Sequence, residues 1–172
     1  MRLLSAEDLR RTQWLSAQTA VAVSPDGGSV AYSTYREEDA QWAGTSLPGS
    51  IAMVGKVGAR LWVTDSTTGQ TREVAEGLTA GAPTWSPDGA LLAFFAAAGA
   101  DAPVHLHCWH VDSGRLQVFA SHSVQTRRMA SGRPRCMSEG RRVCFPALPA
   151  SVVWNGPAPP KRRRGGDASA DG

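Results

Sequence analysis

Short apolar runs alternate with polar turns along this chain, and two of the turns are identical. Ser24-Pro25-Asp26-Gly27 and Ser86-Pro87-Asp88-Gly89 each join two runs of strand-forming residues. In such a turn proline presets φ, aspartate tolerates the bridge region, and glycine can take the left-handed conformation that closes a hairpin. The pattern predicts two β-hairpins, with a positive φ at Gly27 and Gly89.

The same hairpin occurs a third time in degenerate form. A shift of 62 residues superimposes the two tetrapeptides and lays Val30-Ala31-Tyr32 over Leu92-Ala93-Phe94. A shift of 51 residues from the second copy places Glu139 and Gly140 on its Asp-Gly pair, although Ser138 replaces the turn proline. A third hairpin is therefore predicted at Glu139-Gly140.

A second motif lies between these hairpins. "ARLWVTDSTTGQTREV" and "VHLHCWHVDSGRLQVF" align at an offset of 45 residues, with Leu61 on Leu106 and Gly69 on Gly114. Each reads as a strand, a polar turn ending in glycine, and a returning strand. Hairpin plus hairpin makes a unit of four antiparallel strands, and repeats of roughly 40–50 residues with four strands are typical of propeller blades.

The sequence therefore predicts an all-β fold, a partial β-propeller of about two and a half four-stranded antiparallel blades. The predicted strands lie near 20–24, 29–34, 60–65, 70–75, 82–86, 91–96, 104–109, 115–120, 133–137 and 141–146. The predicted parts are an N-terminal helix at 5–14, blade 1 at 20–76, blade 2 at 81–121 and a partial blade 3 at 132–147, all within an incomplete propeller at 1–150, followed by a disordered basic tail at 151–172. Ser5 and Asp8 have the spacing of a capping box at the start of the helix.

These motifs resemble a known family. The pattern "x-W-S-P-D-G-x-x-L-A-F" followed by "L-W-V-x-D-x-x-T-G" is similar to the TolB-type, WD-like propeller repeat. The opening "LLSAEDLRRTQWLSAQTAVAVSPDGGSVAYSTY" resembles the start of bacterial prolyl oligopeptidase-family serine peptidases, particularly their acylaminoacyl-peptidase-like branch. The resemblance covers about residues 3–146. It implies a propeller that covers the active site of an α/β-hydrolase domain later in the chain.

The resemblance leaves two functional classes open. The first is the N-terminal propeller fragment of such a peptidase, which would gate access of peptide substrates to a hydrolase domain absent from this chain. The alternative is a stand-alone TolB-like module that binds a protein partner. The N-terminal helix would either dock on the hydrolase domain or cover the side of the propeller. Blade edges left open in an incomplete ring invite self-association.

Catalytic chemistry is not expected from these 172 residues alone. The nucleophile elbow of α/β-hydrolases reads G-x-S-x-G, and the nearest match, Gly27-Gly28-Ser29-Val30-Ala31, lacks the last glycine. No catalytic residue is assigned, and the chain is predicted to be inactive alone.

Eighteen glycines, eleven prolines and six tryptophans fit a soluble protein rich in turns and blade cores. The N-terminus has no long apolar segment, so no signal peptide or membrane span is expected. Three cysteines argue against a disulfide framework and favour the cytoplasm. Cys136 and Cys144 flank the third hairpin turn and could face one another, with a pair of buried thiols as the expected state.

Charge and histidine content suggest three further candidate sites, and in each case a structural role is the favoured interpretation. Residues 1–126 hold eight basic and twelve acidic side chains, whereas residues 127–172 hold ten and three. The run at 161–164 (Lys-Arg-Arg-Arg) could bind phosphate, but it lacks interleaved aromatic residues, so a solvated tail is expected rather than a nucleic-acid site.

His105, His107, Cys108 and His110 are zinc-ligand types. Because side chains alternate along a strand, one metal could take only two of them, and no metal or cofactor is expected. The acidic run Glu37-Glu38-Asp39 could bind a cation or a substrate amine, and a solvated loop is expected.

Overall fold

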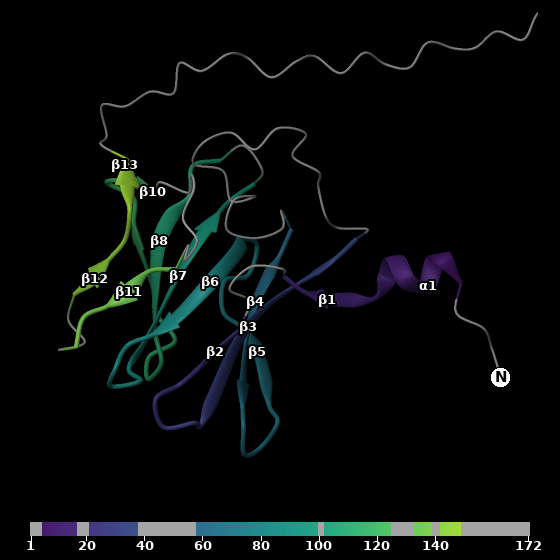
Figure 1. The fold of residues 1–172 in the computed structure, drawn as a ribbon, viewed down its shortest axis with the longest axis horizontal. Helices are drawn as coiled ribbons and strands as arrows, with labels where there is room; N and C mark the ends of the chain where they lie inside the picture. Colours follow the sequence, from purple (N-terminus) through teal and green to yellow (C-terminus); the bar gives the residue numbers. More distant parts are fainter. Residues whose placement is uncertain are drawn as a thin grey trace, which may run out of the picture.

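A computed structural model describes residues 5–16, 21–37, 58–99, 102–124, 133–138 and 142–148. This part of the chain folds into one short helix and a series of antiparallel sheets (Figure 1). The predicted all-β fold with open propeller-like blades is confirmed. None of the described helices is long and apolar enough to cross a membrane.

The first sheet contains five strands in which β3 is central. Its strands are β1 (Gln13–Leu15), β2 (Val21–Val23), β3 (Ser29–Arg36), β4 (Arg60–Asp65) and β5 (Thr71–Glu73). β4 pairs along one edge of β3, and β1 and β2 pair with successive parts of the other edge. β5 is the outer edge of the sheet.

The second sheet is a regular four-stranded blade in the order β6-β7-β8-β9. Its strands are β6 (Thr79–Trp85), β7 (Leu91–Ala97), β8 (His105–His110) and β9 (Leu116–Phe119). β6 begins three residues earlier than predicted and contains an irregularity between Gly81 and Thr84, where Ala82 has a φ of 58°. Positive φ is rare for a residue with a Cβ, so the sequence carried no signal for this kink.

The third unit is smaller. β11 (Arg135–Cys136) pairs with β12 (Val143–Cys144), and β10 (Ser123–Val124) pairs with β13 (Ala147–Leu148). The β11–β12 hairpin lies where the third hairpin was predicted, with shorter strands. The β10–β13 pair was not predicted.

Strand register repeats across the three hairpins. Ala22 pairs with Ala31, Thr84 with Ala93, and Arg135 with Cys144. These pairs are related by the offsets of 62 and 51 residues found in the sequence. The backbone of Met137 donates to Arg142 O at 2.9 Å, as Ser86 donates to Leu91 O at the same distance. The third hairpin is therefore a structural copy of the other two.

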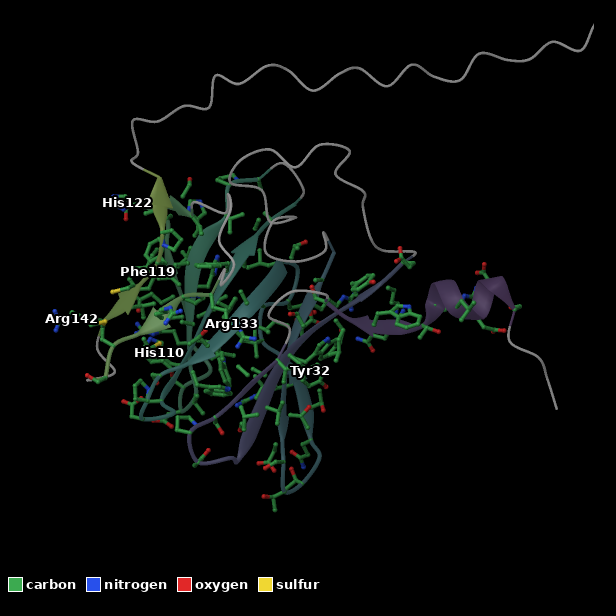
Figure 2. All side chains as sticks on the ribbon, viewed as in Figure 1. Tyr32, His110, Phe119, His122, Arg133 and Arg142 are labelled. Carbon is green, nitrogen blue, oxygen red and sulfur yellow. The ribbon has the colours of Figure 1, made fainter. Side chains whose placement is uncertain are left out.

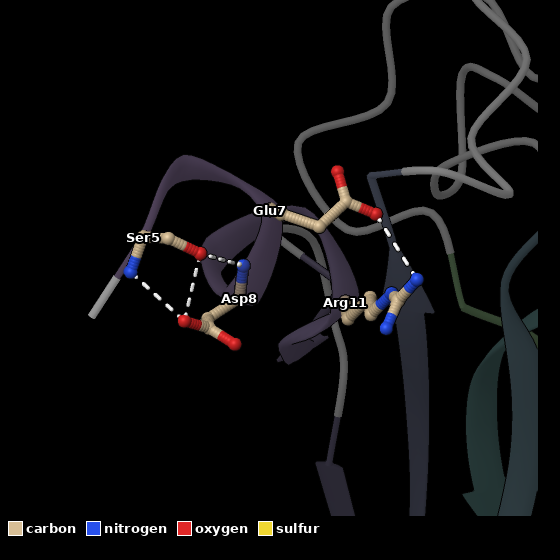
Figure 3. A network of polar contacts seen from close by, with 4 residues as sticks. All are labelled: Ser5, Glu7, Asp8 and Arg11. Carbon is tan, nitrogen blue, oxygen red and sulfur yellow. Dashed lines mark hydrogen bonds and ion pairs between the residues drawn. The ribbon is translucent and has the colours of Figure 1, made fainter. Parts of the chain in front are cut away.

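The N-terminal helix is shorter than predicted. α1 (Ala6–Arg11) begins with the expected capping box: Ser5 Oγ accepts from the Asp8 backbone, and the Asp8 carboxylate accepts from the Ser5 backbone (Figure 3). The prediction that it runs to residue 14 is wrong. Thr12 is already extended, and Gln13–Leu15 form β1, because pairing with β3 satisfies more backbone groups than another turn of an isolated short helix.

Two apolar clusters fill the spaces between the units. The first joins the first and second sheets and includes Leu61, Val63, Trp85, Leu92 and Phe94. The second joins the second sheet to the third unit and includes Phe95, Val104, Leu106, Cys108 and Cys136. The strands β6, β7 and β8 of the second sheet are therefore buried on both faces, whereas the side chains of β9 are exposed.

The pairing of Cys136 and Cys144 is also corrected. Cys136 pairs with Val143, and Cys144 pairs with Arg135, so the two cysteines are offset by one position in the ladder. Side chains one position apart lie on opposite faces of a hairpin. Cys136 packs in the second apolar cluster. The prediction that both thiols are buried is wrong for Cys144, which is exposed.

We predict that Gly89→Val destabilises the protein more than Gly99→Val. Gly89 has a φ of 71°, a region in which a β-branched side chain is strained by about 1–2 kcal/mol. Gly99 has no such φ, and a Cβ there would meet no atom within 4 Å. Chemical denaturation of both variants measures the difference. Equal losses of unfolding free energy would show that the turn conformation does not matter.

Candidate functional site

The two Ser-Pro-Asp-Gly turns have the same network of hydrogen bonds. Ser24 Oγ donates to the Asp26 carboxylate at 2.6 Å and accepts from the Ser29 backbone at 2.8 Å. Ser86 Oγ makes the same two contacts, with Asp88 and the Leu91 backbone. Each carboxylate also accepts a backbone N–H, from Gly28 or Ala90.

These contacts assign the turn residues a structural role. The hydrogen bond from Ser24 and that from the Gly28 backbone hold the pKa of Asp26 below its usual range. The Ser86 hydroxyl and the Ala90 backbone lower the pKa of Asp88 in the same way. Gly27 and Gly89 both have positive φ, as predicted. Glu139 and Gly140 of the third turn lie outside the described residues.

The first strands of the three hairpins, β2, β6 and β11, lie next to one another and connect the units. Trp85 of β6 donates its indole N–H to Ala22 O of β2 at 3.1 Å. Arg72 of β5 places its guanidinium carbon 4.3 Å from the centre of the Trp109 ring of β8. The first two sheets are thus tied by a hydrogen bond between β2 and β6 and by a cation–π contact between β5 and β8.

Arg133 extends this connection to the third unit. Its Nη2 donates to Val21 O at 3.0 Å, joining residues 112 positions apart in the sequence. Partial burial lowers the pKa of the Arg133 guanidinium. Figure 2 shows Arg133 between the β11–β12 hairpin and the first sheet. No sequence motif marks this arginine, since only the folded arrangement of the strands brings it to β2.

Among the described residues, the histidine-rich strand β8 is not part of a group that could hold a metal ion. Its alternation is as expected: Leu106 and Cys108 belong to the cluster with the third unit, whereas Trp109 belongs to the cluster with the first sheet. His105 contacts His122 O, and His110 contacts Arg115. Within the described ranges, no group of three or more His, Cys, Asp or Glu side chains could hold a metal ion.

His107 is the most unusual polar group of the second sheet. Its ring stacks on Phe94 with centroids 5.6 Å apart, and its Nδ1 is buried without a hydrogen-bond partner. Burial, helped by the nearby His105, lowers the pKa of His107 to about 4. It is therefore a neutral core histidine at physiological pH.

Serine, histidine and carboxylate groups do not assemble into a nucleophilic site in the described part of the chain. One serine–histidine contact is present, between Ser121 Oγ and His122 Nδ1 at 3.1 Å. The two residues are sequence neighbours, and both are exposed. Activation of a serine requires a base that a third group orients. Among the described residues, no carboxylate contacts the His122 ring.

The first sheet has surface hollows among the described residues. One, of about 260 Å³, is lined by Ser29, Val63, Asp65, Gln70, Thr71 and Arg72. The Asp65 carboxylate there accepts the backbone N–H groups of Thr67 and Thr68, which lower its pKa, and Arg72 stacks on Trp109. Both charges of this hollow are thus engaged by the protein itself.

Another hollow, of about 100 Å³, lies at the β1 end and includes Gln13, Thr34 and Trp62. Gln13 and Trp62 both donate to Thr34 Oγ1. Of the acidic run predicted to form a surface loop, only Glu37 lies among the described residues, and it is exposed. The tail at 151–172 lies outside them.

Comparison with known proteins gives a match at the level of fold. No model of a protein family and no curated protein sequence matches the chain. The structure is similar to acylaminoacyl peptidase from Pyrococcus horikoshii, with a TM-score of 0.50 and 13% sequence identity over 78% of this chain and 17% of that chain. It is also similar to TolB from Acinetobacter baumannii, with a TM-score of 0.47 and 17% identity over 72% of this chain and 25% of that chain.

The chain thus spans only a small part of each of these proteins. The resemblance of the sequence repeats to a TolB-like propeller portion of prolyl oligopeptidase-family peptidases is confirmed as a resemblance of fold.

We predict that the stability of the protein falls between pH 6.5 and pH 4 because of His107. Its folded-state pKa lies below the ordinary value of 6.5, so in this interval the unfolded chain binds more protons than the folded one. The contribution is complete above pH 6.5 and is lost as the pH falls, by as much as about 3 kcal/mol.

His107→Phe should keep the stacking on Phe94 and flatten this part of the pH profile of unfolding free energy. His122→Ala changes an exposed histidine and should leave the profile as in the wild type. A profile of His107→Phe that is as steep as that of the wild type would contradict the assignment.

Proposed function

We propose that this chain forms the N-terminal propeller portion of a prolyl oligopeptidase-like serine peptidase and gates peptide access to a hydrolase domain outside these 172 residues. The observation that carries the proposal is the fold similarity to acylaminoacyl peptidase over 78% of the chain. The N-terminal sequence that resembles these peptidases agrees with it.

The helix α1 supports a docking role. It projects to the side of the first sheet, to which β1 joins it (Figure 1). Leu9 on this helix keeps 50% of its surface exposed. An exposed apolar residue on a capped helix that stands away from the sheets favours contact with another domain over coverage of the propeller side.

Gating by a propeller is steric, so the blades must hold a fixed arrangement. Trp85 and Arg133 provide it, because each bonds a backbone carbonyl of β2 from another unit. Such a device restricts which substrates reach a site but lowers no chemical barrier. We place this role in the cytoplasm, and the three free cysteines support a reducing compartment.

We predict that the purified chain does not turn over chromogenic peptide or ester substrates and is not labelled by a serine-directed fluorophosphonate. Peptide hydrolysis needs an activated nucleophile, its base and oxyanion donors, and the sequence has no G-x-S-x-G elbow to present such a serine. Mass spectrometry after labelling measures the outcome. Stoichiometric modification of one serine, abolished by its replacement with alanine, would reveal an active site in this chain.

The reading frame downstream of residue 172 tests the peptidase assignment directly. A G-x-S-x-G elbow followed by Asp and His residues supports the proposal. Further Ser-Pro-Asp-Gly repeats without that elbow would instead favour the stand-alone TolB-like module that binds a protein partner.

Gating itself is tested on the longer protein by comparing kcat/KM for a short peptide and for the same sequence within an unfolded polypeptide. A gated site prefers the short peptide by at least about tenfold, or about 1.4 kcal/mol. Equal values would contradict gating.

A further inference from the structure

The outer edge strands of the two sheets differ sharply in chemistry. β5 and β9 are equivalent by the 45-residue repeat, which places Thr71 on Leu116 and Glu73 on Val118. The three residues of β5 are Thr, Arg and Glu, whereas the four residues of β9 are Leu, Gln, Val and Phe. Charged residues on an edge strand discourage pairing with other chains, and β9 has none.

The side chains of β9 are also accessible. Leu116, Val118 and Phe119 are 38%, 51% and 38% exposed. Among the described strands, β9 pairs only with β8. The strand therefore presents an apolar, uncharged edge at the rim of the second sheet.

The hydrogen-bond pattern identifies which backbone groups of β9 point outward. The His110 backbone donates to Arg115 O at 2.9 Å, so this pair at the end of the β8–β9 hairpin is hydrogen-bonded. Bonded and non-bonded pairs alternate in an antiparallel ladder. Cys108–Gln117 is then a bonded pair, and the N–H and C=O groups of Leu116 and Val118 face away from β8.

We propose that β9 is a self-pairing edge through which two copies of this chain associate, antiparallel and around a twofold axis at Gln117. This register is the one that pairs the outward backbone groups of both residues within the strand: Leu116 pairs with Val118 of the second copy, and Gln117 lies opposite itself. A twofold arrangement of this kind is self-complementary by construction.

The flanking residues fit the same register. Leu116 and Val118 form two apolar cross-strand pairs on one face of the joined sheet. Arg115 comes opposite Phe119 of the second copy, which allows a cation–π contact. Four-residue strands bury less than the roughly 1,200 Å² of a standard interface, so the dimer is weak and forms in about the 10 μM to 1 mM range.

The decisive test replaces the edge of the second sheet with that of the first. The double variant Leu116→Thr/Val118→Glu gives β9 the residues that stand at the same positions of β5, where the fold accommodates them. Sedimentation velocity over the stated concentration range should show a reversible dimer for the wild type and a monomer for the variant. Circular dichroism and Tm verify that the variant is folded.

A wild-type protein that stays monomeric would overturn the proposal. So would an association that persists in the folded double variant, since it would then use another surface such as the open face of the first sheet. Thr71→Ser on β5 is the matched control and should dimerise as the wild type does.

Crosslinking tests the register. In a Cys144→Ser background, Gln117→Cys should form an intermolecular disulfide when oxidised glutathione accepts the two electrons and two protons released by the paired thiols. Arg72→Cys, the equivalent position on β5, should not. Equal crosslinking of the two variants, or none at position 117, would contradict the twofold axis at Gln117.

Discussion

Burial of the second sheet between its two neighbours is the constraint on which the rest of the structure depends. β7 alternates its side chains between the two sides: Phe94 packs toward the first sheet and Phe95 toward the third unit, and both are fully buried. Burial of each phenylalanine contributes about 1.5–3 kcal/mol. A sheet with two apolar faces is stable only when both are covered, so the flanking units are required by the composition of this one strand.

The hairpins were predictable because their determinants are local. Each Ser-Pro-Asp-Gly turn satisfies its own backbone groups through its Ser and Asp side chains, and the turn then sets the strand register. β1 and the β10–β13 pair were not predictable in this way. Their strands pair with partners 19 or more residues away, and their own sequences contain no turn motif that would bring those partners together.

The candidate site also contains parts that depend on local sequence and parts that depend on the packing of distant segments. The positive φ of Gly27 and Gly89 follows from the turn residues alone, whereas the Arg133 contact with Val21 depends on three units being stacked in order. The histidines of β8 show that a local sequence pattern can also suggest a site that the fold does not form. Their spacing resembles that of metal ligands, but strand alternation turns His107 into the core on one side and Cys108 on the other, and burial decides the chemistry of both.

One repeat position shows how the stacking is encoded. Val23, Trp85 and Cys136 are equivalent in the three hairpins, and in the second and third this position packs against the preceding sheet. Trp85 packs in the first interface and donates to Ala22 O, while Cys136 packs in the cluster that contains Cys108. Burial raises the pKa of both thiols. Val23 faces no preceding sheet among the described residues and is 58% exposed. In the other two hairpins this position packs between blades, so the first sheet of a propeller portion needs an apolar residue there. The exposed Val23 agrees with the proposed role within a larger ring.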